Sequence, residues 1–168
     1  MIFLQMRVSV KMSSMELIKK LRDSTGSGIV DCKKALSENN NDIESAVRWL
    51  REKGILKAQK KQDRETNEGV VSFYNNSSHT EFTVCKIKCE TDFVSRGEAF
   101  QEFANAVVEI AFDNAIDSVE SLMQAQYGES TVETARVELV GRVGENIQVS
   151  AVHYAKHEGE FVSVYSHG

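Results

Sequence analysis

The spacing of apolar residues changes character along the chain. From residue 13 to residue 53 they recur every three or four positions, which is the spacing of one helical face. The third segment of this kind carries Ile43, Ala46, Val47 and Leu50. Polar turns rich in Gly, Ser and Asn separate the segments. This pattern predicts three short helices that bury their apolar stripes against one another.

Two of these helices begin with the residue pair of a capping box. Ser13 lies three positions before Glu16, and Asn41 lies three positions before Glu44. In this motif the first side chain accepts a hydrogen bond from a backbone N–H, and the glutamate reaches back to the cap. We therefore expect Ser13 and Asn41 to cap their helices. A unit of about forty residues buries little surface, so it should depend on the rest of the chain or on a partner.

Beyond residue 69 the period shortens to two. The segments VVSFY (70–74) and EFTVCKIKC (81–89) alternate on either side of a polar turn and predict an antiparallel hairpin. Two further strands are predicted at 147–155 and 161–165. One face of the second strand is predicted to be buried, and it carries Thr83, Cys85, Ile87 and Cys89.

Two longer helices are predicted between these strands. One runs from Glu98 to about Ala115, and the other begins with Ser130, which lies three positions before Glu133, and ends at Gly144. Such helices must cover the sheet, so we predict an α+β fold in which helices cover one face of an antiparallel sheet. The apolar stripe of the first helix comprises Phe100, Phe103, Ala104, Val107, Ile110 and Ala111.

The predicted elements divide the chain into four parts. These are an N-terminal extension (1–12), a three-helix domain (13–54), a basic linker or helix (55–68) and the α+β domain (69–168).

Charge is distributed unevenly over these parts. Residues 48–64 hold seven Lys and Arg against two acids, whereas residues 65–168 hold six against seventeen. A surface that reads nucleic acid needs a basic face, so we expect no direct nucleic-acid partner. No apolar run approaches the ~20 residues of a membrane-spanning helix, and we expect no membrane association. The three cysteines indicate free thiols in a reducing compartment.

Catalytic motifs are missing from the sequence. The segment TGSGIVDCKK (25–34) lacks the spacing and the preceding strand of a phosphate-binding loop. His153 and His157 have a spacing found in zinc sites, but no cysteine pair lies near to complete four ligands. We therefore expect a protein that is not an enzyme and has no cofactor, no metal and no small-molecule substrate.

The segment Thr91–Val94 lies between a predicted strand and a predicted helix. On spacing alone, the favoured interpretation places Phe93 in the core and Asp92 at the helix cap. In the alternative, Asp92 and Phe93 project together and enter a pocket on a partner, because aromatic side chains in pockets carry much of the energy of an interface.

Four segments resemble known sequences in the same order. The run LIKKLRDSTGSGIVDCKKALSENNNDIESAVRWLREKG (17–54) resembles the ubiquitin-associated-like helical domain of elongation factor Ts. The segments KCETDFVSR (88–96), VGENI (143–147) and YSHG (165–168) resemble further stretches of that family. The resemblance implies a guanine nucleotide exchange factor of translation elongation, which binds the GTPase domain of elongation factor Tu. Asp92 and Phe93 would enter near its magnesium and phosphate site.

The resemblance also implies further contact residues. Three of them, Leu21, Ile29 and Val30, have an alternative interpretation, in which they form the core of the three-helix domain. The chain departs from the family at Gly97, which follows Arg96 where members usually carry Asn, Asp or Glu, and longer members continue beyond Gly168. The implied contacts with elongation factor Tu, besides Asp92 and Phe93, are Thr91, Val94, Leu21, Arg22, Ile29, Val30, Val143, Gly144 and His167.

Other interpretations of the sequence stay open. The helical domain alone also resembles ubiquitin-binding and nascent-chain-binding adaptor modules, and a small hydrolase or metal protein is a further alternative. The segments CETDFVSR and WLREKG resemble mitochondrial and related α-proteobacterial members of the family. This resemblance favours a mitochondrial protein, with the bacterial cytoplasm as the alternative compartment. The sequence does not predict an oligomeric state.

Overall fold

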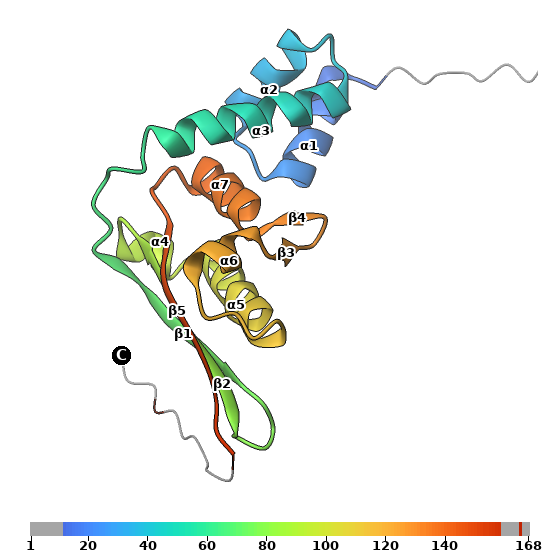
Figure 1. Ribbon diagram of the computed structural model, residues 1–168. Coiled ribbons are helices and arrows are strands. Elements are labelled where there is room, and N and C mark those ends of the chain that lie inside the picture. Colours follow the sequence, from blue (N-terminus) through green and yellow to red (C-terminus); the bar gives the residue numbers. More distant parts are fainter. Residues whose placement is uncertain (1–11, 159–164, 166–168) are drawn as a thin grey trace, which may run out of the picture. The chain divides into compact units, whose positions relative to one another are not determined.

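The computed structural model describes residues 12–158 and residue 165 (Figure 1). The chain divides into two compact units between Glu52 and Lys53. Each unit has a hydrophobic core of its own and is described separately. The four-part division expected from the sequence stays a prediction.

The first unit is built from the three predicted helices. They are α1 (Ser14–Thr25), α2 (Ile29–Glu38) and α3 (Ile43–Gln59), of which α3 continues into the second unit. The prediction of three N-terminal helices is confirmed. Their shared core comprises the buried residues Leu21, Cys32, Ala35, Leu36 and Ala46.

The helix caps match the sequence prediction only in part. At α1 the capping box is present: the backbone N–H of Ser13 donates to a Glu16 carboxylate oxygen at 2.7 Å, and Ser13 caps the helix in return. The prediction that Asn41 caps α3 is wrong. Asp42 accepts the backbone N–H of Ser45 at 2.8 Å, whereas Asn41 has φ 62° and forms the preceding turn. A cap needs an extended backbone, which Asn41 does not have.

The second unit begins within α3, which continues beyond Gly54 to Gln59. Gly54 is buried, and a Cβ added there would lie 3.9 Å from the carbonyl oxygen of Val137 in α7 (Val132–Val143). A Cβ added to Gly141 of α7 would in turn lie 3.7 Å from Cα of Gly54. Gly54 thus lies inside a helix, and its lack of a side chain allows α3 and α7 to approach closely.

The sheet of the second unit has three antiparallel strands in the order β1-β2-β5. They are β1 (Glu68–Asn75), β2 (Glu81–Cys89) and β5 (Gln148–Lys156). The register of β2 against β5 shifts between Lys86 and Ile87. The predicted inward face of β2 is confirmed, because Thr83, Cys85, Ile87 and Cys89 are all fully buried.

Helices cover the inner face of this sheet, which confirms the predicted α+β fold. The helix α5 (Glu98–Asp113) contacts all three strands, and α6 (Val119–Gln124) contacts β5 on the same side of the sheet (Figure 1). Buried residues of α5 supply much of the core, among them Phe100, Phe103 and Val107.

Several short elements of the second unit were not predicted. These are α4 (Asp92–Ser95), α6, and a two-stranded pair of β3 (Gln126–Tyr127) and β4 (Ser130–Thr131). The cap of α7 is Thr131 rather than Ser130, because Thr134 N–H donates to the Thr131 hydroxyl at 3.2 Å. Gly144 ends α7 as predicted, with φ 82°. The strand predicted at 161–165 falls largely outside the described residues.

Candidate protein-binding site

The segment Thr91–Val94 forms the start of α4, a helix of four residues between β2 and α5. Thr91 has an extended backbone and caps the helix, since its hydroxyl accepts the backbone N–H of Val94 at 3.4 Å. Phe93 is 87% exposed, so the favoured prediction that it packs in the core is wrong. Val94 and Ser95 turn toward the core instead, which leaves the second helical position pointing outward.

Asp92 occupies the first helical position beside Phe93. The sequence suggested that Asp92 caps the helix, but Thr91 is the cap. The Asp92 carboxylate instead lies 3.4 Å from the guanidinium of Arg96, one turn further on. The Asp92 side chain is 49% exposed and that of Arg96 is 80% exposed. An ion pair this open to water is worth little, so the Asp92 carboxylate is available to another partner.

A second loop holds the base of α4. The backbone N–H and the hydroxyl of Thr91 both donate to the carboxylate of Glu145, at 3.0 and 2.6 Å. In the opposite direction, the backbone N–H of Asn146 donates to the carboxylate of Glu90 at 2.6 Å. We call Glu90, Thr91, Glu145 and Asn146 the cross-loop latch. Both segments carry the family resemblance, but nothing in their sequences predicts that they meet.

Val143 and Gly144, the other residues that the resemblance implied here, lie at the end of α7. Val143 is half-buried and packs against the core, whereas Gly144 is exposed. The ammonium group of Lys61 donates a hydrogen bond to the carbonyl oxygen of Gly144. Val143 and Gly144 thus directly precede the latch residue Glu145 in the loop after α7.

The first unit presents an exposed apolar pair of its own. Ile29 is 56% exposed and Val30 is 80% exposed, at the first two positions of α2. Arg22 is exposed on α1. Leu21 is fully buried in the core of the unit, so its side chain supports this surface from beneath. His167, the last of the implied contacts, lies outside the described residues.

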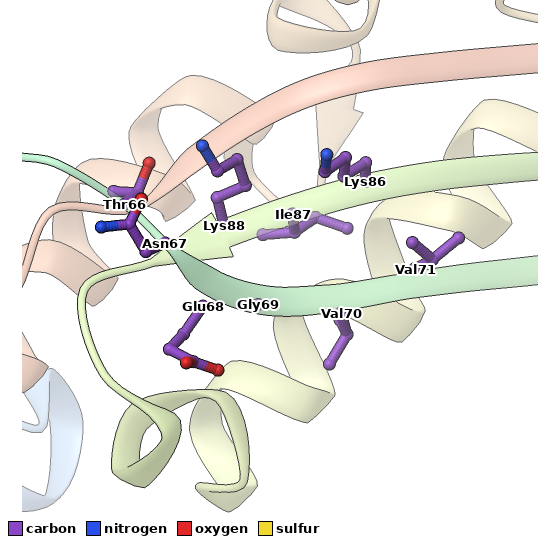
Figure 2. A pocket seen from close by; sticks show the side chains of 9 residues that line it. All are labelled: Thr66, Asn67, Glu68, Gly69, Val70, Val71, Lys86, Ile87 and Lys88. Atoms are coloured by element: carbon purple, nitrogen blue, oxygen red, sulfur yellow. The ribbon is translucent and has the colours of Figure 1, made fainter. Parts of the chain in front are cut away.

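One surface hollow lies at the start of β1, beside the end of β2, and it has a volume of about 370 Å³. Figure 2 shows the side chains of Lys86 and Lys88 on one side of the sheet and those of Glu68 and Val70 on the other. Its polar groups therefore do not converge on one point, as those of a small-molecule site do. Its lining residues are Thr66, Asn67, Glu68, Gly69, Val70, Val71, Lys86, Ile87 and Lys88.

The thiols of the second unit lie in surroundings that disfavour chemistry. Burial raises the pKa of Cys85 to about 12 and that of Cys89 to about 11. The thiolate is the reactive form of cysteine, so both side chains act as small core residues.

Residues 12–158 hold neither a metal-ligand cluster nor a helix that could cross a membrane. No cluster of three or more His, Cys, Asp and Glu that could hold a metal ion is found in that range. His153 contacts the Asp117 carboxylate at 2.9 Å. No helix in the same range has the length and apolar character needed to cross a membrane.

Exposed apolar side chains at the starts of two helices, one in each unit, are typical of a protein-binding module. Two family models match the chain: the one described as Elongation factor TS covers residues 90–168, and the one described as Elongation factor Ts, mitochondrial, N-terminal covers residues 1–61. The chain belongs to the elongation factor Ts family.

Curated relatives agree with this assignment. The chain is 40% identical to elongation factor Ts of Chlorobium phaeobacteroides (strain BS1) over 158 residues, which cover 92% of the chain and 55% of the relative. It is 41% identical to that of Idiomarina loihiensis over 152 residues, which cover 90% of the chain and 51% of the relative. The chain thus spans about half the length of the curated relatives it matches.

Proposed function

We propose that this chain is a guanine nucleotide exchange factor of translation elongation, which binds elongation factor Tu loaded with GDP and promotes release of the GDP. Membership of the elongation factor Ts family supports this function. The observation that carries the mechanism is the 87% exposure of Phe93, next to Asp92, at the start of a helix held from beneath. A large aromatic ring displayed in this way fits a pocket on a partner.

In the proposed mechanism, Asp92 and Phe93 enter the GTPase domain near its magnesium and phosphate site. Magnesium and backbone amides hold the phosphates of a bound nucleotide electrostatically, so a small displacement of either removes much of their attraction. No covalent bond forms or breaks, and the exchange factor needs no catalytic residue or cofactor of its own. Coupling is reciprocal: a factor that weakens GDP binding must bind the nucleotide-free GTPase more tightly.

The remaining contacts are assigned to two surfaces. Ile29 and Val30 of α2 and Arg22 of α1 form the contact of the helical unit, and Leu21 lies in the core of that unit. Around α4 the proposed contacts are Thr91, Val94, Val143 and Gly144, and His167 is proposed near the end of the chain. We propose no contact with nucleic acid, membrane or a small-molecule substrate.

Two compartments fit this function. The family model that matches residues 1–61 is described as mitochondrial, which supports the mitochondrion. The curated relatives are bacterial proteins, which supports the bacterial cytoplasm.

The proposal is tested by stopped-flow release of fluorescent GDP from elongation factor Tu. Micromolar wild-type chain should accelerate release, and replacement of both Asp92 and Phe93 by Ala should largely abolish the acceleration. Val71→Ala is the matched control, because Val71 is 65% exposed on β1, where it lies opposite Lys86 on the outer face of the sheet. A release rate that micromolar wild-type chain leaves unchanged contradicts the proposal.

A further inference from the structure

The exposed ring of Phe93 cannot hold its own helix in place. A side chain that is 87% exposed contributes little packing energy, and α4 has only four residues. Isolated helices of this length are not stable in water. The direction in which Phe93 points is therefore fixed by contacts of other residues: Val94 and Ser95 pack toward the core, and further contacts hold the base of α4.

The cross-loop latch supplies those contacts in both directions. Glu145 accepts two hydrogen bonds from Thr91, and Glu90 accepts one from the backbone of Asn146. Hydrogen bonds to a carboxylate are shorter and stronger than those between neutral groups. Thr91 is also the cap of α4, so a group that holds both its N–H and its hydroxyl fixes the first turn and hence Phe93.

The segment that follows α3 compensates the charge of the two glutamates. A guanidinium nitrogen of Arg64 lies 3.5 Å from the Glu90 carboxylate. The ammonium group of Lys61 donates to the carbonyl of Gly144, the residue before Glu145. Burial and the neighbouring Arg64 lower the pKa of Lys61, whereas the carboxylates of Glu90 and Glu145 raise it. The carboxylates are therefore compensated by two cations from one segment.

Asn146 binds this segment to the latch. Its side-chain amide donates to the carbonyl oxygens of Gln62 and Arg64, at 3.1 and 2.9 Å, and the residue is 1% exposed. Lys61 adds its hydrogen bond to the carbonyl of Gly144. The chain between α3 and β1 is thus fixed to the loop that holds α4, although the sequence predicted only a basic linker or helix there.

We propose that Glu145 is a positioning residue for nucleotide exchange: its carboxylate holds the start of α4 so that Phe93 is presented in one fixed direction. This inference rests on the proposed exchange function. A ring already fixed in its bound direction loses less conformational freedom on insertion than one on a loose turn. Glu145 then affects insertion of Phe93 and leaves the first encounter with the GTPase unchanged.

The test measures GDP release over a range of factor concentrations, using the full chain. Glu145→Ala should lower the maximal release rate about tenfold, which corresponds to the loss of one charge-assisted hydrogen bond of about 1.4 kcal/mol. The concentration that gives half-maximal release should change less than about twofold, because the initial contact is retained. Glu145→Gln keeps an acceptor oxygen at this position and should restore part of the rate. Glu129→Ala, at an exposed glutamate between β3 and β4, is the control for lost charge.

A double-mutant cycle separates positioning from a general loss of structure. The affinity for nucleotide-free elongation factor Tu is measured for Glu145→Ala in the wild-type and Phe93→Ala backgrounds. If Glu145 acts through Phe93, its replacement should weaken affinity about tenfold in the first background and less than about twofold in the second. An equal loss in both backgrounds, or a maximal release rate that Glu145→Ala leaves intact, overturns the inference.

The two proposals fail in different ways. If the wild-type chain does not accelerate GDP release, the exchange function itself is wrong. If wild type and Phe93→Ala behave as proposed but Glu145→Ala matches wild type, only the positioning role is wrong. Should Glu145→Ala fail to fold, as judged by circular dichroism, Glu145→Gln carries the same cycle, and a loss that is equal in both backgrounds again overturns the inference.

Discussion

Two helices of this chain, α2 and α4, expose apolar side chains in their first turn, but different contacts hold the two first turns in place. In α2 the exposed apolar residues are Ile29 and Val30 at the first two positions, and in α4 the second position carries Phe93. Val30 and Phe93 are the most exposed at these starts, at 80% and 87%. Both helices follow a residue with an extended backbone, Gly28 or Thr91.

The support beneath the two starts differs. Thr91 caps α4 with its hydroxyl and is held by Glu145, whereas Gly28 offers α2 no side-chain cap. The helix α2 has ten residues and is anchored by Cys32, Ala35 and Leu36 in the core of its unit. A longer helix can rely on core packing to fix its first turn, while a four-residue helix needs hydrogen bonds at its base.

The first prediction tests the statement that packing fixes α2. Leu21→Ala removes a fully buried side chain from a small core and should lower the free energy of unfolding of the first unit by about 3 to 4 kcal/mol. Trp49 is the only tryptophan of the chain and packs against this core, so its fluorescence reports on the unit. Met15→Ala on the same helix, at a residue 74% exposed, should change the unfolding transition little. Equal transitions for the two variants would contradict the assignment of Leu21 to the core.

The second prediction compares the exposed residues. Phe93→Ala should lower the maximal rate of GDP release roughly hundredfold, because a buried aromatic anchor contributes several kcal/mol to an interface. Val30→Ala removes two methyl groups and should mainly raise the half-saturating concentration, by about fivefold. Both side chains are exposed in the free chain, so neither change should shift the thermal unfolding midpoint by more than a degree or two. The reverse pattern, with Val30 controlling the maximal rate, would show that the roles are exchanged.

Long periodic segments were predictable from the sequence, and local details were not. The inward residues of β2 and the apolar stripe of α5 follow from periods of 2 and 3.6. Two caps were placed one residue early, at Asn41 and Ser130, because two capping residues stand side by side at each helix start. The helix α6 and the β3–β4 pair are too short to show a period.

The candidate site was predictable only as a segment. Periodicity cannot tell whether Phe93 faces the core, because that depends on how α4 lies against the sheet, and spacing alone favoured the wrong answer. The partners of the latch are separated by 54 residues for Thr91 and Glu145, and nothing local in either segment indicates the other. Thr91 and Glu145 meet because β5 pairs with β2, which places the loop between α7 and β5 beside the end of β2.

The third prediction gives α2 the cap that α4 already has. At Gly28 the backbone is extended and an added Cβ meets nothing within 4 Å, so Gly28→Ser is sterically tolerated. The new hydroxyl should accept an N–H of the first turn and stabilise the first unit by a few tenths of a kcal/mol. This corresponds to a rise of about 2 °C in the Trp49 transition. Gly26→Ser is the control and should lower the temperature of this transition, because φ is 66° at Gly26 and a side chain there is strained. A transition lowered by Gly28→Ser would contradict the account of this start.

The last prediction concerns pH and the carboxylates at the other helix starts of the first unit. The backbone N–H of Ser13 lowers the pKa of Glu16, and hydrogen bonding by Ser45 lowers the pKa of Asp42. A carboxylate with a lowered folded-state pKa stabilises the fold above its unfolded pKa, and this contribution is lost as pH falls through the folded value. The Trp49 transition should therefore weaken between about pH 5 and pH 3. Replacing Glu16 by Gln and Asp42 by Asn should flatten this dependence, because the start of α2 has no side-chain cap to titrate. If the double variant loses as much stability as wild type over that range, the acid sensitivity arises elsewhere in the unit.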